Sequence, residues 1–471
     1  MTATGEQQAA DEINRLLVRL TQFLLRNSAE GGFEVRDTVR RVAEACGAKA
    51  DVLAIAEGAV LTVRHRDDSS YAETVQVTPE LARLDLVSEG KFLVRRIVDG
   101  ELGARAANRA LTELNRRPGP YQPWLRGVGV ILFAVGFAPS VQATWTEIGY
   151  SLALGAVMAV VFLAAERASA LRILLPIVGP LAVGVVAFAG LQAHRQPGGP
   201  IVLMVPALFV LIPGDYLCAA TAEIAVGQLT PGAVRLAQAA FTLLEIALGI
   251  IIAAEVSGVG TRSLFEATVP RGLPYWLIVI SWVPFVFGMA LTFSARLCDI
   301  PWILVLTYLA WGVQLGVTKW VGPDAGTFVA AGLLAASAGF LELSPSRPPR
   351  IVLILGGFFA LTVGSVALRG LTTLDGGHSI QGFGDLRDAI TQTAAITLGL
   401  IVGAVPVQAA AVRRRRAAAV AGGGLGRGLG RGLGPGLRLG LRQLQPVRDA
   451  WLVAELGLAD GNESGAGENG P

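Results

Sequence analysis

Three adjacent residues in the middle of the chain could do chemistry inside a membrane: Pro213, Gly214 and Asp215. They end the apolar run IVLMVPALFVLI, which covers residues 201–212 and is shorter than the roughly 20 residues of a straight bilayer-crossing helix. Proline and glycine interrupt helices, and freed backbone groups are tolerated at membrane depth only beside protein or water. The pattern predicts a broken helix beside a cavity, where helix ends could hold a small charged solute.

Two further carboxylates extend this candidate site. Glu245 lies near the middle of the run AVRLAQAAFTLLEIALGIIIAAEV, and a carboxylate at that depth is costly and usually faces the interior of a helix bundle. Glu245 is either a protonatable coupling site or counter-charge for a substrate ammonium, or it makes a structural hydrogen bond between helices. Asp215 and Glu223 either bind the amino group of a substrate or cap helices at the wet inner interface.

The chain also resembles itself at an offset of 150 positions. Gly214 then falls on Gly364, and Thr362-Val363-Gly364-Ser365 becomes the weak point of the second half, although it lacks the proline. The other aligned pairs include Ile201/Ile351, Phe209/Phe359, Gly227/Gly377, Gly232/Gly382 and Gly249/Gly399. The candidate substrate-binding or coupling residues are Pro213, Gly214, Asp215, Glu223, Glu245, Gly364 and Ser365.

The elements that must position these residues are apolar segments. Residues 1–117 hold 17 basic and 18 acidic side chains, whereas residues 124–412 hold 13 of each, so the mean hydropathy of +0.55 belongs to the middle of the chain. Ten apolar segments are predicted there, at about 125–143, 148–165, 171–193, 200–212, 233–256, 274–293, 301–317, 327–341, 351–368 and 388–412. Each half holds five, and because five is odd, the second half enters the membrane the opposite way up. Inverted repeats with mid-membrane sites are a feature of secondary transporters.

The predicted fold is therefore a polytopic α-helical membrane protein of ten spans in two inverted five-helix repeats, 124–256 and 274–412. Residues 1–117 read as a cytoplasmic α+β domain, with helices near 11–27, after residue 34 and at 89–116, and three strands between residues 50 and 79. The first 20 residues show no cleavable signal peptide. Residues 413–471 read as a flexible Gly/Arg-rich tail, or as one attracted to anionic lipid through its arginines.

Several classes of function are disfavoured by composition. Three dispersed cysteines and three dispersed histidines predict no disulfide framework, zinc site or other metal site. No GxxxxGK[ST] motif is present, so transport energy must come from a gradient. The soluble region offers no catalytic constellation, and we expect no enzyme activity, no cofactor and no nucleic-acid partner.

Three stretches resemble the threonine/serine exporter family. They are LLRNSAEGGFEVRDTVRRVAEACGAKADVLAIAEGAVLTVR, the block LIPGDYLCAATAEIAVGQLTPGAVRLAQAAFTLLEIALGI, and TVGSVALRG, in which Val363 takes the place of the family's proline. The resemblance covers roughly residues 11–412. It implies a cytoplasmic N-terminal domain, ten spans and export of small hydrophilic amino acids driven by the proton motive force.

The hypothesis from sequence is an exporter of threonine- and serine-like amino acids in a bacterial inner membrane, working by alternating access. Its expected partners are the amino-acid substrate, protons, the lipid bilayer and a possible second copy of the chain. Both termini are expected in the cytoplasm, because Arg413–Arg416 follow the last apolar segment. The alternatives are an exporter of small dicarboxylates such as succinate and a membrane-anchored sensor or scaffold.

Overall fold

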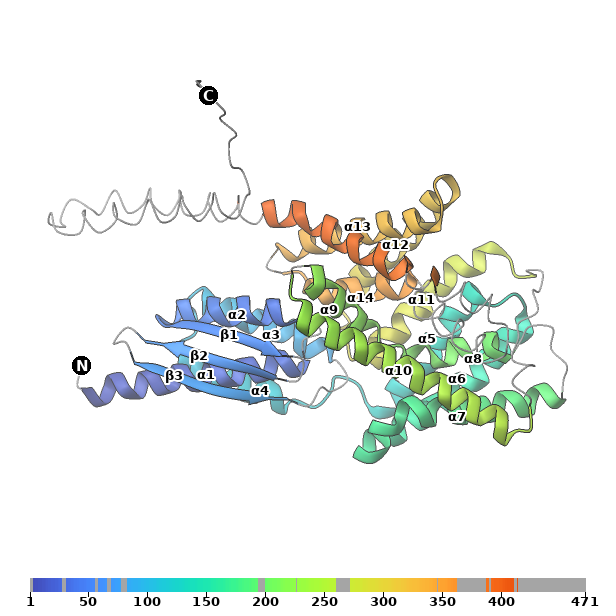
Figure 1. Cartoon of the computed structure of the whole chain (residues 1–471), viewed down its shortest axis with the longest axis horizontal. Helices are drawn as coiled ribbons and strands as arrows, with labels where there is room; N and C mark the ends of the chain where they lie inside the picture. The colour runs from blue at the N-terminus through green and yellow to red at the C-terminus, as the bar shows by residue number, and fades with distance from the viewer. Residues whose placement is uncertain are drawn as a thin grey trace, which may run out of the picture. The chain divides into compact units, whose positions relative to one another are not determined.

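The N-terminal part combines four helices with a small sheet (Figure 1). The computed structural model describes residues 3–27, 31–55, 58–65, 69–77, 83–193, 200–225, 227–259, 272–344, 346–361, 387–388, 391–410 and 413. The first elements are α1 (Ala3–Asn27), α2 (Gly31–Ala45), β1 (Lys49–Ile55), β2 (Gly58–Arg64), β3 (Ser70–Gln76), α3 (Leu84–Val98) and α4 (Ala104–Arg116). The strands form an antiparallel meander in the order β1-β2-β3.

One face of this sheet is covered. Residues alternate between buried and exposed along β1 and β2, with Ala50, Val52 and Leu61 buried and Leu53 exposed, as expected for a half-buried strand. Helices α1 and α2 pack on the sheet, and their buried residues share with it a hydrophobic core drawn only from residues 16–114. The helical region predicted at 89–116 is in fact two helices, because Gly100 adopts a left-handed φ of +78° between them.

The described parts of the apolar middle of the chain are helices joined by short connections. Among the described residues, eight helices are long and apolar enough to cross a membrane: α5 (Pro123–Val141), α6 (Trp145–Arg167), α7 (Ser169–Ala193, apolar to Gly190), α10 (Leu229–Val256), α11 (Tyr275–Thr292), α12 (Ile300–Trp320), α13 (Pro323–Glu342) and Thr391–Ala410. Two more apolar helices are shorter, namely Pro200–Leu211 and α14 (Arg350–Ala360). These two are the fourth apolar segments of the two halves. The chain is thus a multi-pass membrane protein, and the count of ten spans stays a prediction.

Helices α5 and α11 pack closely and run in opposite directions. A Cβ built on Gly136 would lie 2.3 Å from the backbone N of Phe285, and one built on Gly288 would lie 2.2 Å from the backbone N of Phe133. Towards the start of α5, Gly129 meets Thr292, at the end of α11. Close approach of this kind needs glycine, because a side chain would hold the backbones apart.

These α5–α11 contacts are reciprocal. Phe285 follows Phe133 by 152 positions, and Gly288 follows Gly136 by the same number. The contact of Gly136 with Phe285 is therefore repeated, with the two halves exchanged, as the contact of Gly288 with Phe133. A second contact is present within each half at equivalent positions. A Cβ on Gly249 would lie 2.5 Å from the carbonyl oxygen of Ile177, and a Cβ on Gly399 would lie 2.3 Å from that of Phe328.

Candidate functional site

The apolar run that begins at residue 200 is broken where Pro213 and Gly214 predict it. Helix α8 (Pro200–Leu208) tightens into the short 3-10 turn η1 (Phe209–Leu211), and α9 (Gly214–Ala225) begins after the break. Ile212 is extended, and the N–H of Gly214 donates to the carbonyl of Ile212 over 2.8 Å. Because Pro213 has no N–H, the regular helical ladder cannot pass this point.

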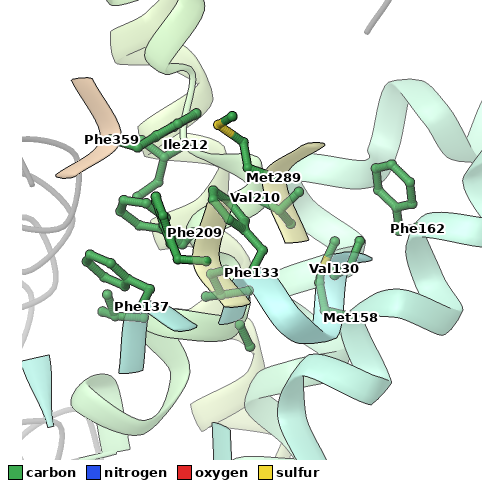
Figure 2. Close-up of a cluster of buried hydrophobic side chains, with 14 of the residues drawn as sticks. Val130, Phe133, Phe137, Met158, Phe162, Phe209, Val210, Ile212, Met289 and Phe359 are labelled. Carbon is green, nitrogen blue, oxygen red and sulfur yellow. The ribbon is translucent and has the colours of Figure 1, made fainter. Parts of the chain in front are cut away.

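Aromatic rings surround the break (Figure 2). Phe209 stacks on Phe137, with ring centroids 3.8 Å apart, and lies 5.5 Å from both Phe133 and Phe359. All four side chains are at most 4% exposed. The break therefore lies in a packed aromatic cluster contributed by α5, η1 and α14, which shields the interrupted backbone from lipid.

One of these contacts joins equivalent positions of the two halves. Phe359 is the counterpart of Phe209 at the offset of 150, and the two rings touch. A Cβ built on Gly214 would lie 2.8 Å from Cε1 of Phe359. The pair Phe133–Phe359 (5.5 Å) is likewise matched by the pair Phe285–Phe209 (6.3 Å). The short fourth segments of both halves therefore meet at the break.

The break also presents two helix ends of opposite polarity. The last carbonyl groups of α8 and η1 form the negative end of one helical dipole, and the first N–H groups of α9 form the positive end of another. Asp215 lies in the first turn of α9, and its side chain is outside the described residues. The break therefore carries partial negative charge on its residue-209 side and partial positive charge on its residue-214 side.

At its far end, α9 holds a buried ion pair. Glu223 is 1% exposed, its Oε2 lies 3.3 Å from Nε of Arg235 in α10, and its Oε1 accepts a hydrogen bond of 2.6 Å from the backbone N–H of Gly32. Gly31 adopts a φ of +62°, and a Cβ there would lie 3.1 Å from Cγ of Glu223. Glu223 therefore ties the broken segment to the start of α2.

The second half is tied to the N-terminal elements through α3. The N–H groups of Leu84 and Asp85 donate to the carbonyls of Phe293 and Ser294. Ser88 Oγ donates to Oδ2 of Asp299 over 3.1 Å. Arg296 Nη2 lies 2.9 Å from Oδ1 of Asp299, and this hydrogen bond raises the pKa of Arg296.

Further along α3, Lys91 pairs with Glu342 at the end of α13, and Nη2 of Arg95 donates to the backbone carbonyl of Glu342 over 2.7 Å. The side chains of Leu84 and Val87 belong to the same hydrophobic core as the membrane helices. Helix α3 is thus part of the packing of the membrane region.

Glu245 lies on α10 away from these contacts. It is half-buried, between the exposed Leu244 and Leu248 and the fully buried Ile246. The described residues offer it no hydrogen bond or ion pair, so its assignment as a coupling group stays a prediction. Gly364 and Ser365, the remaining predicted site residues, lie outside the described residues.

The structure adds one polar residue that sequence reasoning did not select. The Nε2 of Gln142, at the end of α5, donates to Oγ of Ser151 over 2.7 Å and to the carbonyl of Val202 in α8 over 3.2 Å. Gln142 is 2% exposed, and its Oε1 has no partner among the described residues. It lies at the end of the predicted apolar segment 125–143, where nothing in the sequence marks its amide as a buried contact.

Comparison with known proteins decides the family. The family model described as "Putative threonine/serine exporter" matches residues 15–257, which is more than half of the chain. The chain belongs to this family. A relative from Mycobacterium tuberculosis (strain ATCC 25618 / H37Rv), named "Probable threonine/serine exporter", is 25% identical over 417 residues, covering 82% of this chain and 75% of its own length. No solved structure matches.

The region matched by the exporter family includes the broken segment and both buried and half-buried carboxylates. Pro213, Gly214, Glu223 and Glu245 all lie within residues 15–257. The second half of the chain lies beyond the match, so the counterparts in α14 rest on the contacts described above. The resemblance seen in the sequence is confirmed at the level of the family.

Proposed function

We propose that this protein exports threonine, serine and similar small hydrophilic amino acids, using the proton motive force and alternating access of two inverted five-helix repeats. The observation that carries the proposal is the meeting of the two short fourth segments at Phe209, Gly214 and Phe359. In secondary transporters, substrate sites lie at such repeat interfaces and are formed by discontinuous helices.

Two features support the inverted arrangement. The α5–α11 pair runs antiparallel and its contacts between Gly136 and Phe285 and between Gly288 and Phe133 are reciprocal, which is what a twofold axis between them requires. With Phe285 as the counterpart of Phe133 (offset 152) and Phe359 as the counterpart of Phe209 (offset 150), the pair Phe133–Phe359 also matches the pair Phe285–Phe209. Opposite directions of equivalent helices are the defining property of an inverted repeat.

The chemistry of the break suits an amino-acid zwitterion. The carbonyl end of α8 and η1 favours the substrate's ammonium group, and the N–H end of α9 favours its carboxylate. Neither contact involves the side chain of the substrate. Selectivity for a small hydroxylated amino acid must therefore come from the shape of the aromatic cluster and from nearby polar atoms. Gln142, whose side chain donates to the carbonyl of Val202 in α8, is one such polar group.

Proton coupling is assigned to Glu245, the mid-membrane carboxylate of α10. At that depth the charged form of a carboxylate costs much more free energy of solvation than the neutral, protonated form. Protonation on one side of the membrane and release on the other would couple its state to the tilt of the repeat that carries it.

The test is transport by the full chain in proteoliposomes. Vesicles loaded with labelled threonine or labelled succinate receive an imposed pH gradient, with and without an uncoupler. Gradient-dependent threonine flux that the uncoupler abolishes is expected, with little succinate flux. Succinate flux exceeding threonine flux would assign the alternative substrate class, and no flux of either would remove the transporter proposal.

A further inference from the structure

A basic groove lies between α1 and α4, on the N-terminal elements and separate from the broken segment. Its volume is about 450 Å³, and its lining includes five arginines: Arg15, Arg19, Arg105, Arg109 and Arg116. Two glutamates, an asparagine and a threonine complete the lining. The described lining holds no aromatic or aliphatic side chain, so the groove is suited to a charged ligand.

Both carboxylates of the groove already have partners. Glu12 pairs with Arg105 over 2.6 Å, and Glu113 lies 3.6 Å from Arg117, which is outside the lining. Arg19 donates to the neutral hydroxyl of Thr112 over 3.1 Å. Among the described residues, Arg15, Arg19, Arg109 and Arg116 have no carboxylate partner, and all four side chains are exposed.

The spacing of the arginines brings like charges together. Arg15 and Arg19 are four residues apart on α1, and Arg105 and Arg109 are four apart on α4, so each pair shares one face of its helix. Like charges at this spacing destabilise a helix, and the two faces border one groove. An anion shared by these side chains would turn that repulsion into attraction.

One buried acceptor also lies in the groove without a donor. Nδ2 of Asn108 donates to the backbone carbonyl of Glu12 over 3.0 Å, whereas its Oδ1 is buried and has no partner among the described residues. A hydroxyl group of a ligand, or a water held by one, would satisfy this oxygen.

We infer that this groove binds an anion carrying two or more linked phosphate groups. Guanidinium groups match phosphate oxygens in bidentate geometry, and four unneutralised arginines match the charge of a tripolyphosphate. Because the described lining offers no aromatic side chain to stack on a base, we expect the groove to recognise the phosphates and not a nucleobase. The phosphates come either from a soluble compound or from the headgroup of a diphosphate lipid, and the experiment distinguishes the two.

The test measures binding of sodium tripolyphosphate to the full chain in phosphatidylcholine nanodiscs by isothermal titration. The double variant Arg15→Gln/Arg109→Gln should weaken binding about tenfold or more, since hydrogen bonds to charged groups are the strong ones. The matched control is Arg40→Gln/Arg64→Gln, which removes the same charge from exposed positions of α2 and β2 and should leave binding unchanged. Citrate, a carboxylate anion of comparable charge, should bind more weakly than tripolyphosphate.

The source of the phosphate is determined by repeating the titration in nanodiscs that also contain cardiolipin. Tripolyphosphate binding that falls with cardiolipin in the wild-type chain assigns the groove to a lipid headgroup, and unchanged binding assigns it to a soluble compound. Undetectable tripolyphosphate binding, equal affinity in the double variant and the wild type, or tighter binding of citrate overturns the inference. Circular dichroism of each variant confirms that it is folded.

Discussion

At the scale of single residues, two glycines set the distance between the halves. The positions of a Cβ on Gly136 and on Gly288 are occupied by backbone atoms of Phe285 and Phe133, which cannot rotate away. We expect Gly136→Ala to lower the free energy of unfolding by about 1–3 kcal/mol, the usual cost of overpacking. Thermal unfolding in detergent measures this cost. Gly316→Ala is the control, because nothing lies within 4 Å of a Cβ there; equal effects of both would show that α5 and α11 are not locked by glycine.

Glu245 offers a second prediction at this scale. We expect Glu245→Gln to abolish transport driven by a pH gradient while leaving exchange of threonine down its own gradient, since the neutral amide cannot take up or release a proton. Flux in proteoliposomes with and without the gradient measures both. Glu255→Gln changes an exposed carboxylate at the end of the same helix and should have no effect. Full gradient-driven flux in Glu245→Gln would remove the coupling assignment.

At the scale of elements, the break between α8 and α9 was predictable and its surroundings were not. A proline beside a glycine in a short apolar run is visible in sequence, and its effect on a helix is local. The aromatic cluster that covers the break comes from α5, η1 and α14, which are far apart in the chain, and no local pattern marks Phe133 or Phe359 as neighbours. The packing of α3 against the membrane helices was also missed, because its charged residues are typical of a helix in a soluble domain.

The contact between the two short segments predicts an energetic coupling. Ala at position 214 would place its Cβ 2.8 Å from the ring of Phe359, so Gly214→Ala should be destabilising and should slow transport. Phe359→Leu, which costs stability in the wild-type background, should relieve the clash. In a double-mutant cycle of unfolding free energies we expect a coupling of about 0.5–3 kcal/mol. Additive effects would mean that the segments do not meet.

At the scale of the whole molecule, the side of the membrane occupied by the N-terminal elements can be read from Cys298. This residue precedes Asp299, which bonds to Ser88 of α3, so it marks the side on which α3 lies. In a variant with Cys46→Ser and Cys218→Ser, a membrane-impermeant maleimide should label Cys298 only after the cells are permeabilised, as expected for a cytoplasmic N-terminus.

The rate of this labelling carries a further check. Burial, with the nearby charge of Asp299, raises the pKa of the Cys298 thiol, and the thiolate is the reactive form. Labelling in permeabilised cells should therefore speed up as the pH rises from neutral and continue to do so beyond the range of an ordinary thiol. Rapid labelling of intact cells would place the N-terminal elements outside.

The N-terminal elements are fastened to both halves, through Gly32 to Glu223 in the first and through α3 to Asp299 and Glu342 in the second. If the halves tilt in opposite senses during export, the N-terminal elements cannot move together with both halves. The contact through α3 includes side chains of the hydrophobic core shared with the membrane helices, whereas the contact of α2 with α9 is centred on the hydrogen bond from Gly32 to Glu223 and on the ion pair of Glu223 with Arg235. We then expect the hydrogen bond between Gly32 and Glu223 to open and close once in each transport cycle.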